Sequence, residues 1–345
     1  MRIGTTCLLA IALLCACATG FAPTAQDKPK AENTASADDG DTGDKDADDK
    51  KEEPVRTLKV NEVARINTRI ITAEEFIQRL CQREKVYSDP DLRSASWALD
   101  SLIIDELLIQ EAERIAAVPK RRWTNEEYDK LMAAFDEKLQ QVNKAVVEAG
   151  SDPYKKEEFV RLKYDMSMQE FETYLQSVAR DNIIRRQVVN YWKLTTDCAD
   201  AEGVFKRNLK NAKDVQKRLA AGARLEAVAP SESEDMHTRQ SAGVIGTAYR
   251  GDGSFSPEVD EVFWKLKVGE WSQPIKVETG YWVVRKAKFF PRNEAPFFQL
   301  QDQCLQKMPN PSDELMLKWR HAVASSGLYT YERRMPGWDC QAGED

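Results

Sequence analysis

The sequence predicts an α+β protein: a mostly helical domain, then a small α/β domain, then C-terminal helices. Between residues 57 and 195 apolar residues recur at helical spacing, whereas from 242 to 290 glycines and β-branched residues take over. The chain has 345 residues, of which 42% are hydrophobic. That length and composition are sufficient for two modest domains with separate cores and for tails at either end.

Residues 1–18 have the layout of a signal peptide. Arg2 precedes a short apolar stretch from Cys7 to Leu14, and small residues follow. The stretch is too short for a membrane-spanning helix, and no other run reaches the roughly 18 apolar residues that such a helix needs. We therefore expect an exported protein of the periplasm or envelope, soluble in its mature form unless it is lipidated.

The cleavage site has two interpretations. Leu14-Cys15-Ala16-Cys17 is similar to a bacterial lipobox, in which the cysteine is acylated and anchors the chain in a membrane. Ala16-Cys17-Ala18 also satisfies the small-x-small rule of ordinary signal peptidase. We expect lipidation of Cys17, because the acidic segment that follows would suit a tether, and the second interpretation stays open.

Residues 19–56 are predicted to be a disordered acidic linker. From Pro23 to Glu53 the segment has eleven acidic residues, five lysines and no aromatic residue. Such a segment cannot bury enough apolar surface to offset the entropy of ordering. It carries six (eleven minus five) of the seven net negative charges, so the rest of the chain is nearly neutral. A nucleic-acid partner is therefore not predicted.

Residues 57–195 are predicted to form one strand and about four helices. The alternation from Val63 to Asn67 predicts a short strand, and residues 98–116 are apolar nearly all round at helical spacing, which is typical of a buried helix. Three Ser/Thr-x-x-Glu patterns predict capping boxes at helix starts. These pairs are Thr72 with Glu75, Thr124 with Glu127, and Ser167 with Glu170.

Residues 197–290 are predicted to form the α/β domain. Helical spacing through Val204 and Val215 ends at Gly222, and a Ser- and Glu-rich loop follows. From residue 242 the pattern predicts a strand, a short helix and two further strands. Residues 291–345 then contain a proline-rich linker and two predicted helices, Leu300–Met308 and Glu314–Ser325.

The cysteines do not predict a metal site or a cofactor. Cys81, Cys198, Cys304 and Cys340 remain after the signal peptide, without a CxxC pair or a His-Cys cluster. Cys304 lies on an apolar stripe, so buried free thiols are favoured over disulfides, which an oxidising compartment would also permit.

Several stretches resemble known envelope chaperones. Residues 63–80, the helix at 98–116 and "MSMQEFETYL" at 166–175 are similar to the chaperone domain of the SurA and PrsA family. Residues 242–286, with "KVGEWSQPI" and "TGYWVV", resemble the second half of a parvulin-type (PpiC-like) peptidyl-prolyl isomerase domain. The resemblance implies binding of unfolded or proline-containing polypeptides, and C-terminal helices (291–345) that pack on the helical domain.

The parvulin resemblance also implies a site, from which this sequence departs. Active parvulins have two histidines in facing strands, behind a Cys or Asp. Trp282 stands at the last-strand histidine and Val244 at the acid or thiol, while the first-strand position is expected near residues 192–196 or to be absent. The chain's two histidines, His237 and His321, match neither position.

We therefore assign no catalytic residue, and the peptide-binding candidates are four apolar side chains: Val244, Phe255, Val259 and Trp282. Plain core packing is the competing interpretation of these residues. The function predicted from the sequence is an envelope chaperone for unfolded exported polypeptides, with a parvulin-like domain of little or no isomerase activity. An active isomerase and a non-catalytic scaffold lipoprotein are the alternatives.

Overall fold

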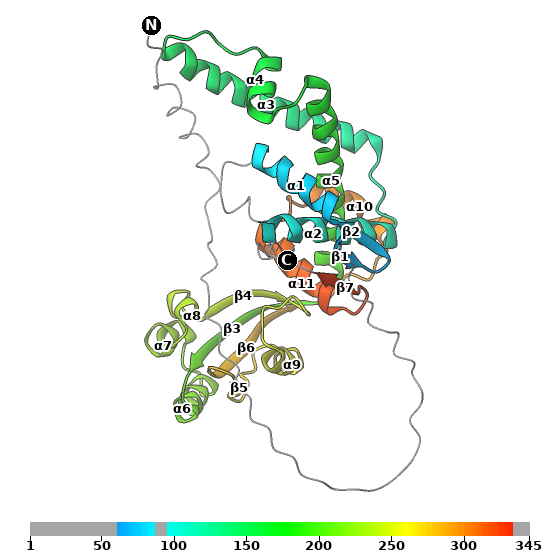
Figure 1. The fold of residues 1–345 in the computed structure, drawn as a ribbon. Helices are drawn as coiled ribbons and strands as arrows, with labels where there is room; N and C mark the ends of the chain where they lie inside the picture. The colour runs from blue at the N-terminus through cyan, green and yellow to red at the C-terminus, as the bar shows by residue number, and fades with distance from the viewer. Residues whose placement is uncertain (1–60, 87–94, 334–345) are drawn as a thin grey trace, which may run out of the picture. The chain divides into compact units, whose positions relative to one another are not determined.

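A computed structural model describes residues 61–86 and 95–333, and it confirms the predicted α+β class (Figure 1). The predicted signal peptide (1–18), Cys17 and the linker (19–56) lie outside the described residues. Within the described ranges, every helix is too short or too polar to cross a membrane.

A small sheet joins the two ends of the described chain. Strand β1 (Glu62–Ile66) pairs antiparallel with β2 (Arg69–Thr72) on one side and with β7 (Tyr331–Arg333) on the other. Asn67 makes the β1–β2 turn with φ 52°, a conformation that asparagine tolerates better than most residues. The sheet order is β2-β1-β7, so the first and last strands are neighbours.

Four helices build the core around this sheet. They are α1 (Ala73–Val86), α2 (Ala95–Arg114), α5 (Met168–Thr195) and α11 (Asp313–Ser325). Their apolar faces meet in one cluster that includes Ile66, Leu99, Val188 and Trp319. The predicted capping box at the start of α1 is confirmed, because the backbone nitrogens of Thr72 and Glu75 each donate to the other residue's side chain, at 2.9 and 3.2 Å.

A second, aromatic core lies between α3 (Arg121–Glu148), α4 (Lys156–Tyr164) and the first half of α5. The ring of Phe135 lies 4.8 Å from Phe171 and 5.9 Å from Phe159. The capping box of Ser167 and Glu170 is confirmed at the start of α5. The one predicted at Thr124 is wrong, because α3 already begins at Arg121 and the Thr124 nitrogen donates within the helix to Lys120.

The α/β domain is a four-stranded antiparallel sheet in the order β4-β3-β6-β5. Its strands are β3 (Cys198–Lys206), β4 (Val244–Tyr249), β5 (Ile275–Val277) and β6 (Gly280–Phe290). The sequence predicted a helix that includes Val204. The first part of this prediction is wrong, since Val204 lies in β3 and helix α6 spans Leu209–Ala220. Pairing with both β4 and β6 stabilises β3 as a central strand despite its Ala, Asp and Glu residues.

Helices cover both faces of this sheet. Helices α6 and α7 (Leu225–Glu232) pack on one face against Val204 and Val283, with α8 (Met236–Gln240) next to them. Helix α9 (Pro257–Lys265) packs on the other face against Ala201 and Val284. This arrangement places β3 and β6 at the centre of the domain, and only the last residues of β6, 288–290, are exposed.

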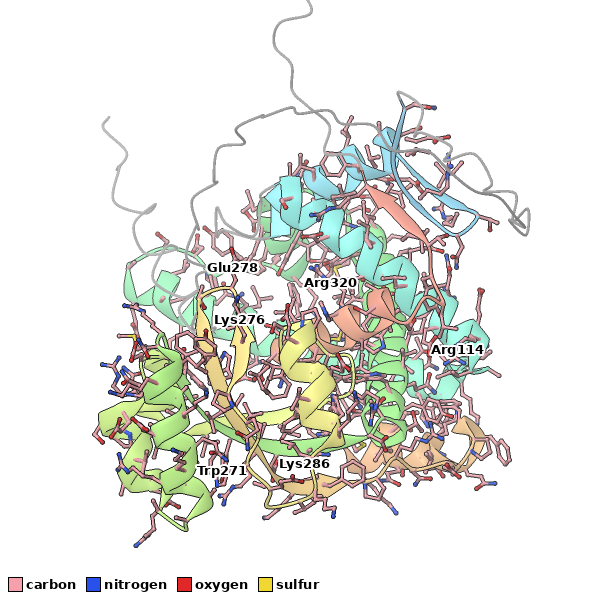
Figure 2. All side chains as sticks on the ribbon, turned by 90° about the horizontal axis from the view of Figure 1, so that it is seen from below. Arg114, Trp271, Lys276, Glu278, Lys286 and Arg320 are labelled. Carbon is pink, nitrogen blue, oxygen red and sulfur yellow. The ribbon has the colours of Figure 1, made fainter. Side chains whose placement is uncertain are left out.

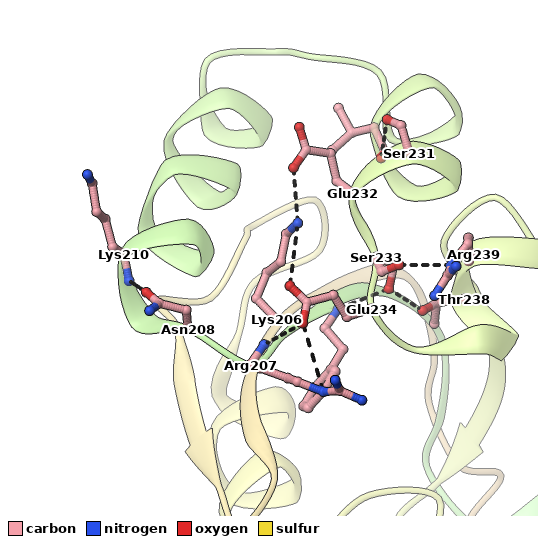
Figure 3. A network of polar contacts seen from close by, with 12 residues as sticks. Lys206, Arg207, Asn208, Lys210, Ser231, Glu232, Ser233, Glu234, Thr238 and Arg239 are labelled. Atoms are coloured by element: carbon pink, nitrogen blue, oxygen red, sulfur yellow. Dashed lines mark hydrogen bonds and ion pairs between the residues drawn. The ribbon is translucent and has the colours of Figure 1, made fainter.

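A polar network fixes the end of β3 to the loop after α7 (Figure 3). The Lys206 ammonium, almost buried, lies 3.1 Å from Glu232 and 3.9 Å from Glu234. The Ser233 hydroxyl lies 2.7 Å from the Thr238 hydroxyl and accepts a hydrogen bond from the backbone nitrogen of Phe205. The network therefore pairs the one charged side chain that β3 buries.

The last helices return to the core of the helical domain. Helix α10 (Phe297–Asp302) continues into a π-helical turn, η2 (Gln303–Lys307), where a helix through Met308 was expected. Phe297 and Trp319 belong to the same apolar cluster as Leu99. Cys304 is a fully buried free thiol, as predicted, and its carbonyl accepts a hydrogen bond from Asn190 at 2.9 Å.

Candidate functional site

The candidate site is an apolar cluster on the face of the large sheet that packs against α9. Three of the four peptide-binding candidates, Phe255, Val259 and Trp282, belong to it or pack against it. Val259 is almost fully buried, whereas Phe255 and Trp282 are half-buried at its margin. The structure therefore brings these three side chains together from α9, the loop before it and β6.

Trp282 is the aromatic residue that β6 contributes at the margin of the cluster. It lies on β6 between Phe205 on β3 and Ile275 on β5, its register partners on the two neighbouring strands. The rings of Trp282 and Phe205 are 5.3 Å apart and tilted. Such an arrangement of two large rings offers an apolar surface with one polar N–H.

Phe255 and Val259 form the helix side of the cluster. The Phe255 ring lies 4.8 Å from the ring of Phe263, a completely buried residue of α9. Pro257, at the first position of α9, fixes the start of this helix right after the loop that carries Phe255. The loop and helix thus present an aromatic ring beside the sheet face that carries Trp282.

Val244, the fourth candidate, is not part of this cluster. It is the first residue of β4, is 48% exposed and pairs with Glu202. The next residue, Ile245, packs against the cluster instead. Because neighbouring side chains of a strand point to opposite faces, Val244 lies on the other side of the sheet.

The sequence placed the first-strand histidine position of active parvulins near residues 192–196, unless it is absent. This placement is wrong. Those residues end helix α5, and the strand that faces β6 is β3. On β3, Gly203 is the register partner of Val284. A Cβ atom at Gly203 would lie only 3.0 Å from the Ile245 side chain and from a carbonyl oxygen of β6, so a larger residue needs its neighbours to move.

The two histidines lie elsewhere. His237 is an exposed residue of the short helix α8, and His321 lies on α11. The ring of His321 abuts Gly253, where an added Cβ would lie 2.6 Å from it. His321 therefore contacts the loop that carries Phe255, whereas His237 lies on α8 beside α7.

Sequence reasoning missed two residues of this face, Phe205 and Lys286. Interpreting the end of β3 as the beginning of a helix hid Phe205. The alternation Trp282, Val284, Lys286 on β6 could have shown that the lysine shares the face of the tryptophan. Figure 2 labels Lys286 near helix α9.

Lys286 is a buried cation with a structural role. Its ammonium donates to the carbonyls of Trp264 and Leu266, at 3.0 and 2.9 Å, and so satisfies the C-terminal end of α9. The rings of Phe263 and Trp264 lie 5.6 Å from it. Burial lowers the pKa of the Lys286 ammonium, with the charge of Arg250 as the second cause.

The residues of the cluster offer an apolar surface, and titratable side chains lie beside it. Its buried members and the hydrophobic residues packed against it are aliphatic or aromatic. Two of the titratable side chains are already engaged, since Lys286 donates two hydrogen bonds to carbonyls and Asp260 accepts one from the Trp264 indole at 2.8 Å. The geometry therefore suits van der Waals contact with an apolar or proline side chain.

Residues 198–288 match the family model of the rotamase, PPIC-type PPIASE domain. The chain is 25% identical over 248 residues to "Foldase protein PrsA" of Caldanaerobacter subterraneus subsp. tengcongensis, covering 65% of this chain and 72% of the relative. It is 28% identical over 115 residues to "Foldase protein PrsA 2" of Bacillus cereus, covering 33% of this chain and 39% of that relative.

Two solved structures also match. The crystal structure of the peptidylprolyl isomerase PrsA from Bacillus anthracis is 14% identical, with 66% of this chain and 90% of that one covered and a TM-score of 0.32. The parvulin domain of PpiD from E. coli is 22% identical, with 28% and 92% covered and a TM-score of 0.25. The matched family model and the foldase relatives agree with the resemblance stated above, and the chain is a PrsA/SurA-like protein with a parvulin-type domain.

Proposed function

We propose that the chain is an envelope chaperone of the foldase type, which binds unfolded or proline-containing exported polypeptides. We propose further that its parvulin-type domain has little or no isomerase activity. The family match at 198–288 and the foldase relatives support the first statement. The observation that carries the second is that Trp282, which stands at the last-strand histidine position, packs on Phe205, while the two histidines of the chain lie on α8 and α11.

Binding would use the half-buried aromatic margin of the cluster. Trp282 and Phe255 are packed on one side and accessible on the other, so an incoming apolar side chain or proline ring would bury surface on both partners. Burial of apolar area is favourable by roughly 25 cal/mol per Å². Such contacts are non-directional, which suits a chaperone that binds many different unfolded chains.

Catalysis would need more than this surface. Rotation about the prolyl amide has a barrier of roughly 18–20 kcal/mol, and an isomerase must lower it by holding and polarising a twisted amide. The Trp282 indole is a hydrogen-bond donor only, whereas a histidine ring both donates and accepts. Gly203 and Val284, opposite each other on β3 and β6, supply no polar side chain to assist it.

The catalytic half is tested by NMR exchange spectroscopy on an Ala-Pro-Phe peptide. We expect the full chain to accelerate cis–trans exchange little above the uncatalysed rate, and Trp282→His alone not to restore activity because its partners are still absent. A rate constant near that of an ordinary parvulin under the same conditions would make the active isomerase the better function. That second candidate is favoured by the family match itself.

The binding half is tested by suppression of aggregation of several unrelated unfolded proteins. Trp282→Ala should weaken suppression, whereas Trp271→Ala serves as the matched control, since Trp271 packs on the opposite face against Arg285, 4.8 Å from its ring centroid. Both variants must melt as folded domains. Capture of one or two partners in fixed ratio, without suppression of aggregation, would instead indicate a scaffold protein.

The membrane anchor is a separate part of the proposal. Cys17 follows Leu14 and Ala16 at the spacing of a lipobox, and a lipid there would tether the chaperone to the envelope. Radiolabelled palmitate should be incorporated into the wild type and not into Cys17→Ser. Equal labelling of both, or none in the wild type, would exclude the anchor.

A further inference from the structure

Helix α6 presents a row of lysines to solvent on the side that faces away from the sheet. Its three buried side chains are apolar and belong to the cluster that packs on the sheet: Ala212, Val215 and Leu219. Lys210, Lys213 and Lys217 are exposed and lie within about 60° of one another on the opposite side of the helix. Figure 3 shows Lys210 pointing away from Lys206 and its partners. We call the three exposed lysines the α6 stripe.

The α6 stripe has no acidic partner in the part of the chain that the structure describes. No carboxylate oxygen there lies within 4.0 Å of its three ammonium groups. Glu232, at the end of the neighbouring helix α7, is already paired with Lys206 at 3.1 Å and with Arg218 at 2.5 Å. Asp214, the one acidic residue of α6, is exposed to solvent. The stripe therefore keeps its positive charge for an external partner.

Two arginines extend the positive charge beyond both ends of the helix. The side chains of Arg207 and Arg224 are 79% and 84% exposed, and the carboxylates of Glu234 and Glu226 lie 4.0 and 3.8 Å from them. Such exposed ion pairs neutralise little charge. Residues 207–224 contain six Lys or Arg and one Asp, a net charge of +5 (six minus one), although the whole chain carries −7. The positive charge is thus a local feature of α6 and its flanks.

A flat anionic surface matches this arrangement. The stripe lies on the outside of a helix, where its side chains can spread over such a surface, and residues 207–224 contain no aromatic residue to stack on bases. The headgroups of an anionic bilayer form a flat surface of this kind, and each Lys or Arg beside it strengthens binding about fivefold. We propose that the α6 stripe contacts anionic phospholipid headgroups and holds this side of the parvulin-type domain against the envelope membrane.

The strength of this contact suits orientation and not anchoring. Three lysines at about fivefold each increase binding to an anionic bilayer about 100-fold. A lipid on Cys17 would already hold the chain at the membrane, and there the high effective concentration makes a weak second contact sufficient. The inference uses the proposed envelope location, but it depends neither on polypeptide binding nor on the lipid itself.

The test measures binding of the full chain to large unilamellar vesicles by co-sedimentation. The chain carries Cys17→Ser, so that no acyl chain contributes. Vesicles of phosphatidylcholine with about 30% phosphatidylglycerol are compared with pure phosphatidylcholine, and the ratio of the two partition coefficients gives the preference for anionic lipid. The triple variant Lys210→Gln/Lys213→Gln/Lys217→Gln should lower this ratio about 100-fold. Roughly 0.5 M NaCl should also lower the wild-type ratio, because salt screens the charges.

Two further variants separate the stripe from total charge and from folding. Lys144→Gln/Lys155→Gln/Lys307→Gln removes the same charge from exposed positions of the helical domain and should bind as the wild type does. Arginine at all three stripe positions keeps the charge and should preserve binding. Equal partitioning of the wild type into both kinds of vesicle, or the same loss in both glutamine variants, overturns the inference. Neither result bears on the proposed chaperone function, which suppression of aggregation tests separately.

Discussion

At the scale of single residues, burial decides which polar groups have a structural role. Lys286 is 4% exposed, yet its charge is tolerated because two carbonyls of the α9 end accept its protons and aromatic rings surround it. The predicted site residues show the same dependence on surroundings. In the sequence, Trp282 and Val244 are both apolar residues of predicted strands. Only the register of β3 with β4 and β6 shows that their side chains lie on opposite faces of the sheet.

We predict that Lys286→Met destabilises the parvulin-type domain by about 1–3 kcal/mol, because the Trp264 and Leu266 carbonyls would lose their buried donor. Methionine retains an unbranched chain, so the change removes the charge with little loss of packing. Lys288→Met, at an exposed position of the same strand, is the matched control and should be nearly neutral. Urea unfolding of both variants measures the difference. Equal midpoints for the two would show that the donated hydrogen bonds contribute nothing to stability.

At the scale of elements, the sequence predicted those whose signals are local. The capping boxes at Thr72 and Ser167, the buried helix α2 and the glycine-punctuated second half of the parvulin-type domain follow from short patterns. Strand β3 was missed because its Ala, Asp, Glu and Gly residues favour no strand, and its pairing partners lie about 40 to 90 residues later in the chain. Misplacing β3 also misplaced the first-strand position of the site.

The C-terminal helix α11 should contribute strongly to the stability of the helical domain. Trp319 is completely buried in the cluster that contains Leu99 and Val188. We predict that Trp319→Ala lowers the free energy of unfolding by about 3–5 kcal/mol, the usual cost of such a cavity. Leu317→Ala on the same helix, at a position 57% exposed, should change it by less than about 0.5 kcal/mol. Calorimetric melting of the two variants tests this, and similar melting temperatures would contradict it.

At the scale of the whole molecule, pairing of β1 with β7 brings the two ends of the described chain together in one sheet. The α/β domain is inserted in sequence between the helices whose residues complete the first core. Local sequence patterns do not show that one domain is inserted within the other, since the cluster around Trp319 joins segments separated by more than 200 residues. The resemblance to a known family supplied the expectation that the last helices complete the helical domain.

The last prediction concerns acid unfolding, because each domain contains a partly exposed carboxylate, Glu75 or Glu232, whose pKa is lowered by hydrogen bonds. Hydrogen bonds from Arg218 and Lys206 hold the pKa of Glu232 below its usual value. Burial raises the pKa of Glu75, but hydrogen bonds from Thr72 and Arg69 outweigh it and the net shift is downward. A carboxyl whose pKa is lower in the folded state stabilises the fold above its unfolded pKa, near 4.5 here, and this contribution disappears as pH falls through the folded value.

We therefore predict that the double variant Glu75→Gln/Glu232→Gln is less stable than the wild type at pH 7, and that the difference shrinks steadily below about pH 4.5, because the wild type loses the same interactions on protonation. Glu74→Gln/Glu278→Gln, at two exposed positions of the same two domains, should follow the wild type at every pH. Urea unfolding between pH 7 and pH 3 measures both differences. A stability gap that stays constant across this range would mean that the two carboxylates act through packing and not through their charge.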